Sequence, residues 1–298
     1  MKKFVKVSAV ILVIAMLVAA FAACSGTEEP DVTSGNAEEN EKVIAKVIDI
    51  DLTTEEYAYG VDKDQPELFE KVNEFIKQIK DDGTFDEICN HYFGDGEPVL
   101  VKSAAKDDSK DQLVVATNAG FEPFEYTVGD SYAGIDMEIA QKLADYLGLE
   151  LVIDNMDFDA VCLSVGQHKC DIAMAGLTVK PDREEFVNFS DSYYYASQRI
   201  IVKSDDDTFA DCADAAAVIA KIQSFDASVK IGYQDGTTGM MFVNNESDYA
   251  DNGFKVSGSG YKNGSLAVQD LMNGNIDYVV IDSAPADCIT KAINETIA

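Results

Sequence analysis

Short apolar strands alternate with amphipathic helices from residue 113 onwards, and this alternation limits the fold more than any other feature of the chain. Residues 113–117 (LVVAT), 149–154 (LELVID) and 277–281 (DYVVI) are predicted strands. Between the first two, residues 134–147 repeat apolar side chains at the spacing of one helical face. Strands separated by helices of this length favour parallel sheets. Because a second unit of this kind begins near Ser204, we predict two α/β lobes.

The composition excludes two classes of function. Apolar residues make up 47% of the 298 residues, enough to bury a substantial core, so the chain is not disordered throughout. Acidic residues number 54 against 23 Lys and Arg, and a net charge of −31 repels phosphate backbones. We therefore exclude nucleic acid as a partner. The two histidines, His91 and His168, lie far apart and share no ligand spacing, so we expect no metal site and no cofactor.

The N-terminus predicts an exported protein. Three lysines within the first six residues precede an apolar run over residues 7–23. A short transmembrane anchor is the alternative, but this run is at the lower limit for crossing a bilayer. We interpret residues 1–23 as a secretory signal peptide. The sequence Phe21-Ala22-Ala23-Cys24 resembles the lipobox of bacterial lipoproteins, which implies lipidation of Cys24. The expected location is extracytoplasmic, with a lipid anchor in the bacterial cell membrane.

Two stretches have the composition of linkers. Residues 24–42 combine small, acidic and turn-forming residues without aromatics, and we interpret them as a disordered tether. Residues 94–111 form a second linker that divides the folded part unequally. The cysteines beyond Cys24 sit among apolar neighbours, and most of them are expected to be buried free thiols, although a Cys162–Cys170 disulfide is an alternative.

Several motifs carry a family resemblance. They are VVATNAGFEPFEY from Val114, AGIDMEIAQKLADYLGLEL, MDFDAV, DIAMAGLTVKPDREEFVNFSDSYY and IGYQDGTTG. Together they resemble the extracytoplasmic solute-binding proteins of polar amino-acid ABC transporters. The resemblance implies a type II periplasmic-binding-protein-like fold with a ligand cleft between two lobes. It also implies a monomer that binds a free polar amino acid, has no enzymatic activity, and delivers the ligand to an ABC transporter permease.

Two other classes of function stay open. One is an enzyme on the same fold, such as a cyclohexadienyl dehydratase, although no nucleophile paired with a base is apparent. The other is a sensory or adhesive lipoprotein that binds a ligand but feeds no transporter.

The order of the motifs departs from the family. Residues 47–94 resemble the C-terminal end of such proteins, yet they precede the start motif. We interpret the chain as circularly permuted, with residues 94–111 joining the family's usual ends; a partial duplication is the alternative. Residues 43–54 and 204–298 would then form lobe 2, and residues 55–203 would form lobe 1. We expect the hinge crossings near residues 54–57 and 202–205.

The resemblance also implies which residues hold the ligand carboxylate. Arg183 matches the family's carboxylate arginine, and a guanidinium offers two parallel N–H bonds to a carboxylate. By the same matching, Gly176 brings backbone close to the ligand and Thr178 adds a hydroxyl. Thr237 and Thr238 add backbone N–H groups and a hydroxyl from the other side of the cleft. The alternatives are a solvated helix residue for Arg183 and a simple turn or helix cap for the Gly-Thr-Thr-Gly sequence.

Asp282 matches the acid that pairs with the ligand ammonium, and its alternative role is a helix N-cap. The ligand side chain would contact a second group of residues, of which Phe158 has core packing as its alternative. These are Asn118, Phe121, Phe158, Ala175, Gln234 and Ile281. Asn118 stands where many relatives carry an acid, and Gly120 replaces an acid found in some arginine-binding relatives. The loss of these acids favours a neutral polar ligand such as glutamine. The overall acidity favours a cation, so the sequence does not select the ligand.

Overall fold

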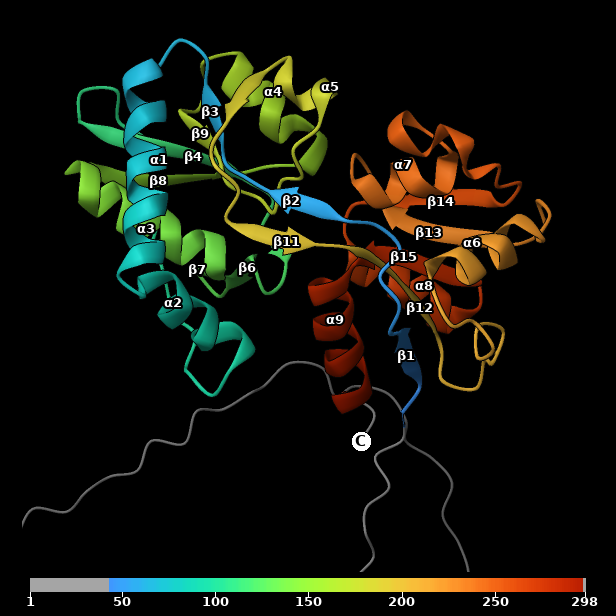
Figure 1. The fold of residues 1–298 in the computed structure, drawn as a ribbon. Coiled ribbons are helices and arrows are strands. Elements are labelled where there is room, and N and C mark those ends of the chain that lie inside the picture. Colours follow the sequence, from blue (N-terminus) through green and yellow to red (C-terminus); the bar gives the residue numbers. More distant parts are fainter. Residues whose placement is uncertain (1–42, 297–298) are drawn as a thin grey trace, which may run out of the picture. The chain divides into compact units, whose positions relative to one another are not determined.

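The computed structural model describes residues 43–296 (Figure 1). The predicted signal peptide, Cys24 and the predicted tether over residues 24–42 lie outside the described residues. Within residues 43–296, no helix has the length and apolar character needed to cross a membrane.

The first lobe is built on a mixed five-stranded sheet. Strand β4 runs parallel to β8 and β9, while β3 runs antiparallel to β9 and β10. The strand order is β10 (Val187–Phe189), β3 (Gly60–Asp62), β9 (Ile172–Ala173), β4 (Gln112–Thr117) and β8 (Glu150–Asn155). The helices of this lobe are α1 (Pro66–Asp81), α2 (Thr84–Phe93), α3 (Ile135–Leu147), η1 (Phe158–Ala160), α4 (Val161–Gly166) and α5 (Pro181–Glu184). A small sheet of β5 (Gly120–Phe121), β6 (Glu125–Val128) and β7 (Ser131–Ala133) adjoins them.

The second lobe is also built on a mixed five-stranded sheet. Strand β13 runs parallel to β14 and β15, and β12 runs antiparallel to β15 and β1. The strand order is β1 (Ala45–Ile48), β12 (Gln198–Lys203), β15 (Tyr278–Asp282), β13 (Lys230–Gln234) and β14 (Ser257–Tyr261). The helices are α6 (Ala215–Gln223), α7 (Thr238–Asn244), η2 (Ser247–Asn252), α8 (Gly264–Asn273) and α9 (Ser283–Glu295). Each lobe therefore mixes the expected parallel strands with antiparallel ones.

The boundary between the lobes differs from the one expected. Strand β12 lies in the second sheet, whereas we expected residues 198–203 to belong to lobe 1. Its backbone groups pair with β1 and β15, and this pairing decides its sheet. The antiparallel pair β2 (Glu55–Tyr57) and β11 (Tyr194–Ala196) carries the chain between the two lobes (Figure 1). The second hinge crossing thus lies just after β11 and not near residues 202–205.

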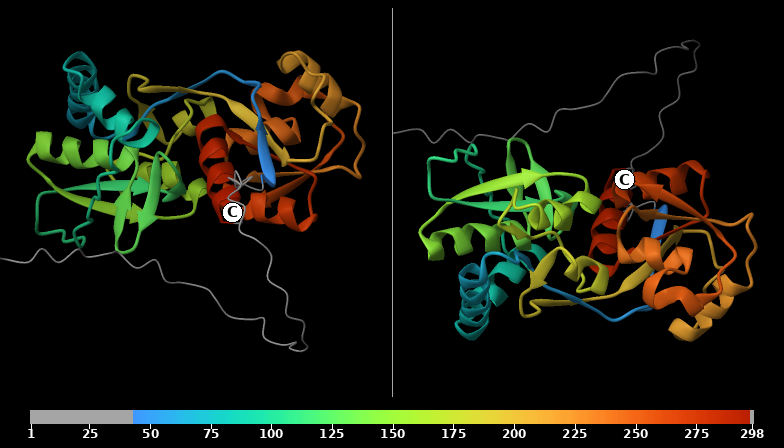
Figure 2. Two further views of the ribbon diagram at one scale, coloured as in Figure 1. Left: turned by 90° about the horizontal axis from the view of Figure 1, so that it is seen from below. Right: turned by 90° about the horizontal axis from the view of Figure 1, so that it is seen from above.

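The two ends of the described chain lie side by side in lobe 2 (Figure 2). The side chain of Asn294, near the end of α9, accepts hydrogen bonds from the backbone N–H groups of Ile44 and Ala45 at 2.9 and 3.1 Å. Its Nδ2 donates to the carbonyl oxygen of Ala45 at 3.0 Å. A direct connection from α9 into β1 would need little change in either element, which supports our proposal that the chain is a circular permutation.

Part of the linker over residues 94–111 is packed against lobe 1. Val101 is only 2% exposed, and its backbone exchanges two hydrogen bonds of 2.8 Å with Tyr132 in β7. The backbone N–H of Ala104 donates to the carbonyl oxygen of Leu151 at 2.9 Å. An apolar side chain and backbone groups that need partners fix this half of the linker to lobe 1. Residues 105–110 are exposed.

Cysteines within residues 43–296 are all free thiols. Cys162 and Cys170 are buried in the core of lobe 1 and form no disulfide with each other. They behave as small apolar side chains, in agreement with the leading interpretation of the sequence.

Cleavage between Asp108 and Ser109 is expected to leave the melting temperature of the protein almost unchanged, because these residues are exposed and the side-chain hydrogen bonds of Ser109 are made within the same turn, to Asp107. Val101→Ala is expected to lower the free energy of unfolding by about 1 to 3 kcal/mol, since apolar atoms leave the core. The matched control Leu100→Ala, at a side chain 56% exposed, should change it by less than about 0.5 kcal/mol. Thermal and urea denaturation measure all three; an unfolded product after cleavage, or equal losses for the two variants, would contradict this description of the linker.

Candidate functional site

A small cavity lies where the two lobes meet. Its volume of ≈ 10 Å³ is roughly the space of one water molecule, so the lobes are closed on each other here. All nine residues that line it belong to the group that the sequence predicted for the ligand site: Phe121, Phe158, Gly176, Thr178, Arg183, Gln234, Thr237, Thr238 and Asp282.

Arg183 is held in the cavity wall by both lobes. It lies on the single turn α5, which begins at Pro181 in the first helical position. Nη1 donates to the carbonyl oxygen of Thr178 at 2.8 Å, and Nη2 donates across the cleft to that of Gly236 at 3.1 Å. The guanidinium carbon lies 5.2 Å from the centre of the Phe158 ring, a cation–π contact. With only 7% of its surface exposed, Arg183 is not the solvated helix residue of the alternative interpretation.

Asp282 lies at the end of β15 in lobe 2 and lines the cavity together with Arg183 of lobe 1. It occupies the N-cap position of α9, but its side chain makes no capping hydrogen bond. Instead, Oδ1 accepts a hydrogen bond of 2.5 Å from the hydroxyl of Tyr57 in the hinge strand β2. Burial and, secondarily, the nearby charge of Glu55 raise the pKa of the Asp282 carboxyl to about 7, although the hydrogen bond from Tyr57 opposes this shift. A positive group brought next to Asp282 would favour its ionised form.

Glu55 is a member of this site that the sequence interpretation missed. Its carboxylate is buried beneath the cavity and accepts four hydrogen bonds. The hydroxyls of Thr178 and Thr238, one from each lobe, donate to Oε2 at 2.7 and 2.8 Å. The hydroxyl of Thr53 donates to Oε1 at 2.8 Å, and Nε2 of Gln198 donates to the same oxygen at 3.2 Å. The two threonine hydroxyls thus donate hydrogen bonds to Glu55, whereas we expected hydroxyls of these motifs to donate to a ligand carboxylate.

Gly176 and Thr237 have local structural roles. Gly176 has a φ of +53°, and a Cβ there would come within 2.9 Å of the Phe121 ring. Its N–H donates to Oδ2 of Asp136 at 2.9 Å and so does not point at the cavity. The hydroxyl of Thr237 caps α7 by accepting from the N–H of Met240 at 3.3 Å. Both residues line the cavity mainly through their shape and backbone.

The predicted side-chain pocket is brought together in part. Asn118 and Gln234 meet across the cleft, where Nε2 of Gln234 donates to Oδ1 of Asn118 at 3.0 Å. Phe121 and Phe158 form apolar walls of the cavity. Asn118, Ala175 and Ile281 do not line it, which differs from our expectation for these three residues. The apolar side chains of Ala175 and Ile281 are buried in hydrophobic clusters instead, because the removal of apolar surface from water is favourable.

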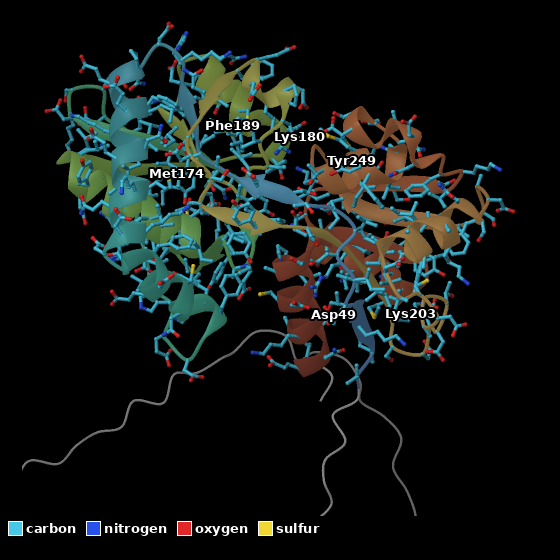
Figure 3. All side chains as sticks on the ribbon, viewed as in Figure 1. Asp49, Met174, Lys180, Phe189, Lys203 and Tyr249 are labelled. Atoms are coloured by element: carbon cyan, nitrogen blue, oxygen red, sulfur yellow. The ribbon has the colours of Figure 1, made fainter. Side chains whose placement is uncertain are left out.

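Further contacts join the lobes outside the cavity. Nζ of Lys180 lies 2.6 Å from Oδ2 of Asp248 and 5.1 Å from the centre of the Tyr249 ring (Figure 3). Lys180 is almost fully buried, whereas the side chain of Asp248 is 69% exposed, so this ion pair lies at the edge of the interface. A second pair, Lys262 and Asp157, lies 3.5 Å apart and is exposed. Among residues 43–296, no cluster of His, Cys, Asp and Glu has the arrangement of a metal site.

The raised pKa of Asp282 makes a prediction about stability. An acid whose pKa is raised by folding holds its proton more tightly in the folded state, so its ionisation costs stability as the pH rises from about 4 to about 7. Asp282→Asn removes this ionisation and keeps an acceptor for Tyr57. Relative to the wild type, the variant's free energy of unfolding should therefore increase by about 2 to 3 kcal/mol between pH 5 and pH 8. Urea denaturation without added amino acid measures it; a difference independent of pH would contradict the assigned burial of this charge.

The sequence matches the family described as bacterial extracellular solute-binding proteins, family 3, over residues 6–95 and 113–297. Among curated proteins, it is 35% identical over 103 residues to the arginine-binding extracellular protein ArtP of Bacillus subtilis (strain 168), covering 35% of this chain and 40% of that protein. It is 28% identical over 177 residues to ABC transporter arginine-binding protein 1 of Escherichia coli (strain K12), covering 58% of this chain and 64% of that protein. The matched part is thus less than two thirds of either relative's length.

Solved structures show the same fold. An ancestral arginine-binding protein bound to arginine superposes with a TM-score of 0.53 at 30% identity, covering 63% of this chain and 77% of that one. An ancestral amino acid-binding protein, AncCDT-1, described as a precursor of cyclohexadienyl dehydratase, gives 0.53 at 26% identity and covers 70% of this chain and 78% of that one. With most of its residues matched, the chain belongs to the bacterial extracellular solute-binding proteins of family 3.

Proposed function

We propose that this protein captures a polar amino acid between its lobes and delivers it to an ABC importer. The observation that carries the proposal is the convergence of Arg183 from lobe 1 and Asp282 from lobe 2 on one cavity. Arg183 has five N–H donors, of which the contacts described above use two, so it can also bind a carboxylate. Asp282 accepts from an ammonium. These two groups match the two charges that every free amino acid carries.

Capture requires the lobes to move. A cavity of ≈ 10 Å³ is far too small for an amino acid, so the lobes must separate for entry and close around the ligand. Within residues 43–296, the antiparallel β2–β11 pair connects the two five-stranded sheets. A hinge of a few residues can absorb the motion of one lobe relative to the other. The closed form is stabilised by the bonds of Arg183 to Gly236 and of Gln234 to Asn118.

Binding without catalysis fits the cavity better than an enzymatic reaction does. The described residues that line it include no His, Cys or Ser, and its two charged side chains suit the ends of a zwitterion. The relatives named above are binding proteins, including two described as arginine-binding. The precursor relationship of one structural relative to a dehydratase keeps the enzyme alternative relevant to the fold.

The proposed anchor follows from the N-terminal sequence. Lipidation of Cys24 would hold the protein at the outer face of the cell membrane, and the chain then enters the folded body at β1 in lobe 2. In this arrangement lobe 2 is tethered, lobe 1 swings, and we expect a monomer. Mass spectrometry of the protein purified from membranes should show an N-terminus at Cys24 that carries acyl chains; an unprocessed Met1 would contradict the anchor.

Arg183→Ala is expected to weaken amino-acid binding by about 2 to 5 kcal/mol, because the ligand carboxylate loses a charge-assisted contact and stays buried. The matched control is Arg199→Ala, the other arginine of the chain. Arg199 pairs with Asp49 and Asp51 at 2.7 Å at the edge of lobe 2, away from the cavity. The control should change the binding free energy by less than about 1 kcal/mol.

The experiment starts with a thermal-shift screen of the full chain against the twenty amino acids, followed by calorimetry of the best ligand with both variants. A ligand at 100 times its dissociation constant stabilises the folded state by about 2.7 kcal/mol. If no amino acid raises the melting temperature, the proposed function is wrong. If an amino acid binds and Arg183→Ala leaves its affinity unchanged, the function stands and the assigned site is wrong.

A further inference from the structure

The carboxylate of Glu55 lies beneath the cavity, and the proposed binding of a zwitterion to Arg183 and Asp282 would leave its negative charge without a counter-charge. Glu55 accepts four hydrogen bonds and donates none, and a carboxylate is the form of a carboxyl group that only accepts. Within residues 43–296, no ion pair includes Glu55 or Asp282. Glu55 is only 3% exposed, so water screens its charge poorly.

The two threonines that contact Glu55 present acceptors to the cavity. A hydroxyl has one proton to donate, and those of Thr178 and Thr238 are both given to Oε2 of Glu55. Thr238 also accepts from Nε2 of Gln198 at 3.0 Å. The remaining lone pairs of the two hydroxyl oxygens suit a donor group of a ligand.

Gln234 adds another acceptor, and its orientation is fixed by a chain of contacts. The carbonyl oxygen of Met156 only accepts, so the group of Asn118 that lies 2.6 Å from it must be Nδ2. Oδ1 of Asn118 therefore faces Gln234, which must present its own Nε2 at 3.0 Å. This leaves Oε1 of Gln234 buried in the described structure without a donor. A buried acceptor without a partner costs free energy, and a ligand N–H group would relieve that cost.

We propose that Glu55 makes this cleft select amino acids with a net positive charge, carried by a guanidinium or a second ammonium group, over neutral amino acids of the same shape. With a ligand ammonium beside Asp282 favouring the ionised form of that acid, the charged side chains at the cavity and its floor are Arg183, Asp282 and Glu55, which leave one negative charge in excess. A zwitterion is neutral and leaves this excess in place, whereas a basic amino acid cancels it. Glu55 acts through its field and through the threonine hydroxyls, without touching the ligand.

This inference rests on the proposed function, and its test uses arginine and citrulline, which differ by a charged guanidinium in place of a neutral urea group. Calorimetry on the full chain is expected to show that arginine binds at least tenfold more tightly than citrulline. Glu55→Gln keeps the size of the side chain and should reduce that preference on the order of tenfold, because a poorly screened charge is lost. Glu56→Gln, at the exposed neighbour on the same strand, should leave it unchanged within about twofold.

A third variant separates charge from hydrogen bonding. Glu55→Asp keeps the charge but shortens the side chain, so the preference for arginine should persist even if both affinities fall. Equal affinities of the wild type for arginine and citrulline would overturn the inference and leave the proposed function intact. A preference that survives in Glu55→Gln, or that is lost equally in Glu55→Asp, would also overturn it. If no amino acid binds at all, the inference fails together with the proposed function.

Discussion

The hydrogen bond between Tyr57 and Asp282 joins the hinge to the floor of the cleft, and the rest of the site is arranged around it. Tyr57 is fully buried in strand β2, and Asp282 ends the central strand β15 of the opposite lobe. Glu55, on the same face of β2, accepts hydroxyl groups from both lobes. Two residues of one short strand, Glu55 and Tyr57, thus connect the hinge with both lobes and with Asp282. Lobe closure and the electrostatics of the cavity therefore depend on the same backbone segment.

The permuted order that we propose changes the connectivity but leaves this arrangement in place. The hinge strand β2 comes early in the chain, and the strands that it joins come later, yet their pairing is set by backbone hydrogen bonds and not by order along the chain. Asn294 fastens the end of α9 to the beginning of β1. The gap in the family match, between residues 95 and 113, falls within the linker that would join the family's usual ends. Both observations support permutation, and neither depends on the ligand.

The sequence allowed much of the fold and of the cavity lining to be predicted. Helix periodicity and apolar strands predicted the two α/β lobes. The family resemblance of the GLTVKPDREE and GTTG motifs implied that Arg183 and Thr238 share one site, and both line the cavity. The assignment of β12 to lobe 1 was wrong because sheet membership is decided by long-range pairing. Glu55 was missed because it lies in the hinge, far from the ligand motifs, and only the folded chain brings it to Thr178 and Thr238. Its signal in the sequence was an acid within the expected hinge crossing over residues 54–57, two residues before Tyr57.

The central claim is that one amino acid bridges Arg183 and Asp282 and thereby holds the two lobes closed. A crystal structure of the protein with the amino acid selected by the thermal-shift screen tests it most directly. The account predicts a cavity large enough for the ligand, the ligand carboxylate on the guanidinium of Arg183, and the ammonium on Asp282 with Tyr57 still donating to that acid. A ligand bound to one lobe alone, or bound with neither charged end on these two residues, would contradict it.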